Sequence, residues 1–184
     1  GQVPERAKVF QIGAMRSRPV YGVRLCIHEI SLDAILTFLE KTPWPGAIAE
    51  LKDVLIFLQP LTQNVTFSID LSDGIGAKIG LECYMNPKIS AGARQAAWIK
   101  MIDKLAERGM VDMAKTSSLK TFDANTETGE LFSELPEELI LAKALMERHA
   151  ESTMWQYLHH IKLTYNSGHP LQTKAYLAVQ LIWR

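Results

Sequence analysis

Two β-hairpin patterns, each preceded by helix-like segments, constrain the fold of this chain more than any other feature. The first pairs residues 64–71 with 77–85, and the second pairs residues 159–166 with 173–183, each around a turn that contains glycine. In these segments apolar side chains alternate with polar or charged ones, which is the period of a half-buried strand. Residues 20–30 show the same alternation and predict one further strand.

Helical periodicity fills four segments between these strands. Ser31 and Ser90 are favourable N-cap residues, so helices are predicted to begin directly after them, the second ending near Arg108. Residues 47–59 and 136–156 carry apolar side chains three and four positions apart, which predicts two more helices.

The order of these segments predicts an α+β fold, in which an antiparallel sheet built from β-hairpins carries helices packed on one face. Direct hairpin connections argue against a doubly wound parallel sheet. Residues 1–19 are polar and mixed in character and are predicted to be an N-terminal arm or linker, whereas residues 20–184 form a single α+β domain. The length of 184 residues is sufficient for a substantial core.

Composition excludes some partners and favours one compartment. The 20 Lys and Arg residues balance the 20 Asp and Glu residues, which argues against nonspecific binding of nucleic acid. No run of about 18 apolar residues occurs, so a membrane partner is not expected. Cys26 and Cys83 lie among apolar strand residues and are predicted to be buried, reduced thiols, which suits a cytoplasmic location.

The polar face of the predicted sheet is the main candidate site. Its cations, Arg24, Lys78, Lys162 and Lys174, exceed the two acids, Asp70 and Glu82. Such an excess suits an anionic small molecule or a substrate peptide, with tyrosines supplying hydrogen bonds. The predicted ligand-binding residues are Arg24, Lys78, Tyr84, Lys162, Lys174 and Tyr176. The alternative is a solvated face with cross-strand salt bridges.

Three residues of the same face are candidates for acid–base chemistry: His28, Glu82 and His160. Neighbouring residues of a strand point to opposite faces, so His159 and His160 are not expected to bind one metal. We therefore predict no metal site and no cofactor.

The glycines between Gly74 and Gly80 resemble those of a phosphate-binding loop, but their spacing fits neither the P-loop nor the dinucleotide motif. No helix is predicted after them. They are better explained as the turn of the first hairpin.

Apolar residues in two places predict a partner surface. Trp44 lies between two prolines, and the final strand carries Leu181, Ile182 and Trp183 on both of its faces. A bare edge strand of this kind invites pairing. The predicted partner is a second copy of the chain or a further domain of a longer protein.

Residues 12–19, 76–84 and 160–165, with 173–177, carry a resemblance to a known group of proteins. Across most of its length the chain resembles uncharacterised bacterial proteins associated with ribosomally synthesised, post-translationally modified peptides. The resemblance implies a role in a peptide natural-product pathway, and it supplies no catalytic residues.

The order of helices and hairpins also resembles the αββα units of aromatic prenyltransferases, in which inward-facing lysines and tyrosines hold a diphosphate. The residues that could occupy those roles are Lys78, Tyr84, Lys162, Lys174 and Tyr176. That barrel uses about five hairpins, whereas this chain offers two and a half. A transferase activity is implied only if the sheet closes into a barrel.

Two functions remain open at this point. The first is a ligand- or peptide-binding domain of a tailoring protein, with an anion-binding polar sheet face. The second is a non-catalytic module for protein–protein interaction or oligomerisation. A concave face with converging lysines and tyrosines favours the first, and an interacting terminal strand favours the second.

Overall fold

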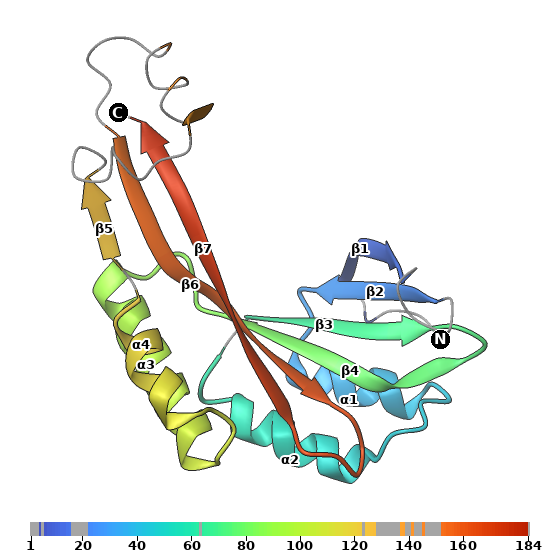
Figure 1. The fold of residues 1–184 in the computed structure, drawn as a ribbon. Helices are drawn as coiled ribbons and strands as arrows, with labels where there is room; N and C mark the ends of the chain where they lie inside the picture. The colour runs from blue at the N-terminus through green and yellow to red at the C-terminus, as the bar shows by residue number, and fades with distance from the viewer. Residues whose placement is uncertain are drawn as a thin grey trace.

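A seven-stranded antiparallel sheet forms the centre of the protein (Figure 1). The computed structural model describes residues 4, 6–15, 22–62, 64–122, 124–127, 137–138, 141, 145 and 152–183. The strands follow the order β1-β2-β3-β4-β6-β5, and β7 pairs with the other edge of β6. This arrangement confirms the predicted α+β class.

The elements alternate between hairpins and pairs of helices along the chain. The strands are β1 (Lys8–Ala14), β2 (Val23–His28), β3 (Asn64–Leu71), β4 (Ile75–Tyr84), β5 (Ala124–Glu127), β6 (Ser152–Tyr165) and β7 (Gln172–Trp183). The helices are α1 (Leu32–Glu40), α2 (Ile48–Leu58), α3 (Ala91–Glu107) and α4 (Met113–Lys120).

Helices α1 and α3 begin where the sequence predicts. The Ser31 hydroxyl accepts a hydrogen bond from the Ala34 amide at 3.1 Å, and the Ser90 hydroxyl accepts one from the Ala93 amide at 3.3 Å. Each bond satisfies one amide that the first turn of a helix leaves without a partner. The N-caps therefore fix the starts of α1 and α3.

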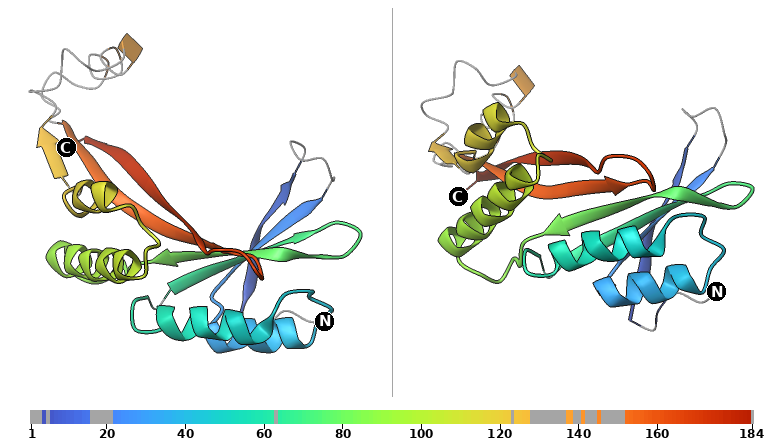
Figure 2. Two further views of the ribbon diagram at one scale, coloured as in Figure 1. Left: turned by 60° about the horizontal axis from the view of Figure 1, so that its bottom comes forward. Right: turned by 90° about the horizontal axis from the view of Figure 1, so that it is seen from below.

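The hydrophobic core lies between the helices and one face of the sheet (Figure 2). Ile35 of α1, Leu51 of α2 and Met101 of α3 are fully buried there. From the sheet, Phe67 and Leu81 are equally buried. Burial of apolar surface on this one face leaves the opposite face to polar side chains.

The register between β4 and β6 joins the two hairpins into one sheet. Residues 79–83 lie opposite residues 161–165, so Leu81 faces Leu163 on the core side. Both leucines are fully buried. The same register places Glu82 opposite Lys162 on the polar face.

Strand β6 is longer than either of its neighbours on this edge. Strand β4 pairs with its residues 161–165, and β5 pairs with its residues 153–156. The four residues between, 157–160, have no strand partner on that edge within the described part of the chain. We call residues 157–160 the sheet gap.

Three segments differ from the sequence-based expectations. Residues 8–14, predicted to belong to an arm, form the edge strand β1, whose mostly exposed side chains leave no alternation in the sequence. Residues 152–156, predicted to end a helix, begin β6 because β5 and β7 pair with them on both sides. Residues 113–120 form α4, where no regular element was predicted.

Trp44 also corrects an expectation, because it belongs to the core and not to a partner surface. Its side chain is 8% exposed, and its indole nitrogen donates a hydrogen bond to the Ala77 carbonyl at 3.2 Å. Its ring packs at a tilt against Tyr165.

Among the described helices, none combines the length and apolar character needed to cross a bilayer.

The core predicts a clear contrast between two isoleucines in neighbouring helices. Ile35→Ala should lower the free energy of unfolding by about 2–5 kcal/mol, because it empties space around a fully buried side chain. Ile56→Ala in α2 should change it by no more than about 0.5 kcal/mol, because Ile56 is 57% exposed. Urea unfolding measures both values, and equal losses would contradict this placement of the core.

Candidate functional site

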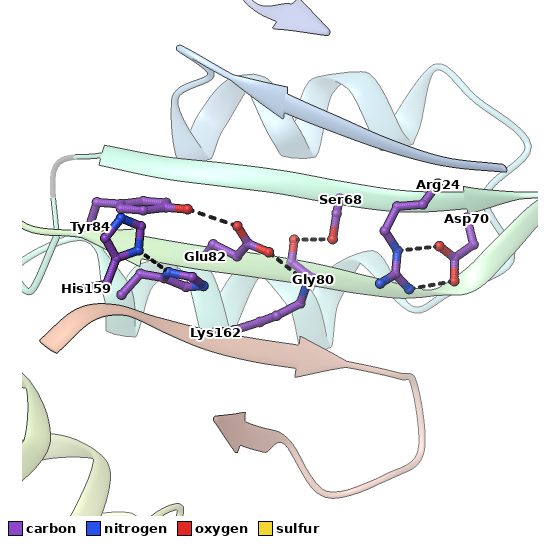
Figure 3. Close-up of polar contacts among 9 residues, drawn as sticks. Arg24, Ser68, Asp70, Gly80, Glu82, Tyr84, His159 and Lys162 are labelled. Carbon is purple, nitrogen blue, oxygen red and sulfur yellow. Dashed lines mark hydrogen bonds and ion pairs between the residues drawn. The ribbon is translucent and has the colours of Figure 1, made fainter. Parts of the chain in front are cut away.

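A partly buried ion pair stands on the polar sheet face (Figure 3). The Lys162 ammonium lies 2.8 Å from one oxygen of the Glu82 carboxylate, and the Tyr84 hydroxyl donates to the other at 3.0 Å. The side chains of Lys162 and Glu82 are only 13% and 16% exposed. The Glu82 carboxylate is therefore held from both sides.

Burial and charge act in opposite directions on this group. Burial raises the pKa of Glu82, but the hydrogen bond and charge of Lys162, with the hydrogen bond from Tyr84, bring it below its ordinary value. Burial, followed by the charge of Glu82, raises the pKa of Tyr84. At neutral pH Glu82 is therefore a carboxylate and Tyr84 is an un-ionised phenol.

Arg24 and Asp70 form a second pair on this face, beyond Gly80 in Figure 3. The guanidinium donates to both carboxylate oxygens, at 2.7 and 2.9 Å. The hydrogen bond to Asp70 is the main cause that raises the pKa of Arg24. Arg24 and Lys162 thus each have a carboxylate partner, which reduces their capacity to bind an external anion.

Lys78 and Lys174, the other two predicted cationic contacts, are exposed, and no ion pair involves them within the described ranges. Lys174 lies opposite Lys162 in the β6–β7 register. The four predicted cations therefore do not converge as free charges on one point, and anion binding on this face stays a prediction.

Small residues form the floor beneath the ion pair. Ser68 is 2% exposed, and its hydroxyl donates to the Gly80 carbonyl at 3.5 Å. A Cβ atom at Gly80 would lie 2.4 Å from the Ser68 hydroxyl and 2.9 Å from Cε of Lys162. Glycine at this position therefore leaves room for the Lys162 side chain, which passes close to Gly80 on its way to Glu82.

The two cysteines are buried thiols, as predicted, and neither forms a disulfide. Burial raises the pKa of Cys83 to about 12, and burial is also the main cause that raises the pKa of Cys26. Both thiols are protonated at neutral pH, so neither is an activated nucleophile.

A β-bulge corrects the prediction that His159 and His160 face opposite ways. Leu158 pairs with Leu177 and His160 pairs with Tyr176, so His159 is an extra residue in β6. Their Nδ1 atoms are 2.8 Å apart, a contact in which one nitrogen donates and the other accepts. Burial is the main cause that lowers the pKa of His160. No group of three or more metal-ligating side chains occurs among the described residues.

The histidines belong to a row of rings that crosses three strands. Along β6, the ring of Tyr157 lies 4.5 Å from that of Trp155 and 6.1 Å from that of His159. Across the sheet, Tyr84 lies 5.6 Å from His159 and 5.0 Å from His160. His160 then stacks on Tyr176 at 4.3 Å. We call these six residues the aromatic row.

A pocket of about 430 Å³ opens where the aromatic row meets the sheet gap. Half of its lining residues carry aromatic rings, and an arginine, an amide and aliphatic side chains make up the rest. The Arg94 guanidinium lies 5.3 Å from the centre of the Trp155 ring, a cation–π arrangement. The residues that line this gap pocket are Asn64, Tyr84, Met85, Pro87, Arg94, Trp98, Trp155, Tyr157, Leu158 and His159.

The nine predicted site residues thus fall into two groups. Glu82, Tyr84, His160, Lys162 and Tyr176 form one connected cluster through the contacts above. His28 lies apart, with its ring 5.0 Å from that of Phe10, in a groove of about 620 Å³ that shares only Asn64 and Tyr84 with the gap pocket. Arg24, Lys78 and Lys174 also lie outside this connected cluster.

Sequence reasoning missed Trp155 and Tyr157, because Trp155 falls in the segment predicted to be helical and Tyr157 lies between that segment and the strand predicted from residue 159. A signal was nevertheless present, since Trp155, Tyr157 and His159 stand two residues apart, the period of one strand face. The barrel that would imply a transferase is not formed by the described strands, because β1 and β7 do not pair with each other.

Comparison with family models, with curated proteins and with solved structures gives no match to the chain. The suggested links to peptide natural products and to prenyltransferases stay predictions. Function is therefore inferred from the geometry of the gap pocket and its neighbours.

The Glu82 pair predicts a stability that depends on pH. Because the pKa of Glu82 is lower in the folded than in the unfolded chain, its contribution is complete above the unfolded pKa, about 4.3. It is lost as the pH falls through the folded value. Glu82→Gln should therefore cost about 1–2 kcal/mol of unfolding free energy at pH 7, and the difference from wild type should vanish in acid.

Glu107→Gln provides the control, because the Lys104–Glu107 pair has the same chemistry on the surface, where its side chains are 48% and 59% exposed. That change should cost at most about 0.5 kcal/mol. Urea unfolding between pH 3 and 7 measures both variants. A Glu82→Gln deficit that does not change with pH would rule out the ionised pair as its cause.

Proposed function

We propose that the protein is a peptide-binding module that holds a ring-bearing segment of an extended peptide in the gap pocket. The observation that carries this proposal is the coincidence of two features at one place. An aromatic pocket opens at residues 157–160 of β6, which no described strand pairs with on that edge. The pocket suits a side chain, and the unpaired stretch of strand suits a peptide backbone.

The aromatic walls support recognition of a ring. Stacked or edge-on aromatic contacts contribute about 0.5–1.5 kcal/mol beyond the area that they bury. Tyr84 is held by its hydrogen bond to Glu82, and Arg94 lies over Trp155. Because these side chains are fixed before a ligand arrives, little conformational entropy is lost on binding. A tyrosine, phenylalanine or proline ring fits this environment.

The unpaired backbone supports recognition of an extended chain. Exposed sheet edges bind peptides through main-chain hydrogen bonds, while pockets beside the edge select alternate side chains. The sheet gap offers such an edge over four residues, bounded by β4 and β5. A short extended segment is the ligand that uses both the edge and the pocket.

Binding is favoured over catalysis by the state of the polar groups. The Glu82 carboxylate already accepts from Lys162 and Tyr84, and His159 and His160 contact each other. The buried thiols are protonated at neutral pH. These groups hold one another in position, which suits a preformed binding surface. A substrate peptide of a tailoring pathway, as the resemblance predicts, is one ligand of this class.

The proposal predicts that affinity follows the ring of the ligand. Acetylated, amidated pentapeptides Thr-Val-X-Val-Thr, with X as tyrosine, proline or alanine, serve as probes. The tyrosine and proline peptides should bind at least about threefold more tightly than the alanine peptide, in line with one aromatic contact. Quenching of tryptophan fluorescence and the rise in melting temperature measure this binding.

Two matched variants locate the site. Tyr157→Ala removes a ring from the gap pocket and should weaken the tyrosine peptide about three- to tenfold. Phe10→Ala removes a ring from the separate groove beside His28 and should leave the affinity unchanged. Equal binding of all three peptides, or equal effects of the two variants, would contradict the proposed function.

A further inference from the structure

Strand β7 pairs with the edge of β6 that lies opposite to β4 and β5, and its own outer edge faces away from β6. It pairs with β6 along residues 172–183, and no other described strand pairs with it (Figure 1). Leu177 is 48% exposed and Val179 is 62% exposed. An edge strand of this length carries a row of backbone donors and acceptors that another extended chain can satisfy.

A groove runs beside this edge on the helix-bearing face of the sheet. Its volume is about 820 Å³, and it lies between β7 and the helices α3 and α4. Its walls are largely apolar, with Ile102, Val111, Leu119, Ala175 and Leu177 among them. In an added strand alternate side chains point to one face, so those of a strand bound to β7 would enter this groove.

The charges at the groove distinguish between occupants. Lys115 and Lys174 line it, and neither forms an ion pair within the described part of the chain. The Asp112 carboxylate accepts a hydrogen bond from the Ala114 amide as the N-cap of α4. A second copy bound through its own β7, in the register that sets the two Lys174 residues opposite each other, would bring like charges together, which is unfavourable. An acidic segment has the complementary charge.

Thr173 gives a separate sign that this region has unused hydrogen-bonding capacity. Its hydroxyl lies at the groove, is buried, and has no hydrogen-bond partner among the described residues. Buried hydroxyls are usually paired, so such a group calls for a partner.

We propose that β7 binds an extended, acidic segment of a partner protein by strand addition. Apolar side chains at alternate positions of that segment occupy the groove, and carboxylates between them lie near Lys174. This surface is distinct from the gap pocket, which lies on the opposite edge of β6. The two sites therefore succeed or fail in separate experiments.

The probes are two fluorescein-labelled heptapeptides, one alternating valine with glutamate and the other alternating valine with lysine. With the full chain, fluorescence anisotropy should show at least tenfold tighter binding of the acidic peptide. Lys174→Glu should reverse that order. Failure of both peptides to bind, or equal binding of the two, would overturn the proposal.

Two threonine substitutions on the same face of β7 test whether binding depends on the groove or only on the exposed strand. Leu177→Thr removes a side chain that lines the groove and should weaken the acidic peptide about tenfold. Val179→Thr, which lies beyond the groove, should change its affinity less than twofold. Equal losses in the two variants would overturn the groove as the binding surface.

Sedimentation equilibrium tests the competing occupant. The wild-type chain should remain monomeric at the concentrations used for binding. A dimer that Leu177→Thr dissociates would show that a second copy occupies the groove, and this would overturn the acidic partner. Circular dichroism melts confirm that each variant is folded; Leu177 is half exposed, so the substitution should leave the core intact.

Discussion

Five residue pairs between β4 and β6 hold the two hairpins in one sheet, and the rest of the structure depends on their register. On one face this register buries Leu81 against Leu163. On the other it brings Glu82 to Lys162. A slip by one residue would exchange the two faces, placing leucines in the polar cluster and charges in the core. Hydrophobic burial and the ion pair therefore specify the same alignment.

This alignment also produces the binding surfaces. Because β6 is longer than the part that β4 covers, a stretch of it remains between β4 and β5. The bulge at His159 turns both histidines to the polar face beside that stretch. On its other edge, β6 carries β7, whose outer edge is paired with no described strand and runs beside the groove of α3 and α4. One long strand thus supports an aromatic pocket and an apolar groove.

Sequence patterns predicted the hairpins, the capped helices and five members of the connected cluster, because alternation and N-caps are local signals. The bulge could not be predicted, since it depends on how β6 pairs with β7, and no residue type at Leu158 or His159 requires it. Trp155 and Tyr157 were missed because long-range pairing overrides the helical pattern around them. The pairing of Lys162 with Glu82 depends on register, which spacing along the chain does not give.

The most direct test of this account is a nuclear Overhauser measurement between leucine methyl groups, with Leu163→Val used to assign the signal. Opposite residues of antiparallel strands have Cβ atoms roughly 5 Å apart, so the account predicts a strong cross-peak between Leu81 and Leu163. A missing cross-peak in the folded protein would mean a different register. The ion pair, the sheet gap and the pocket built on them would then be wrong.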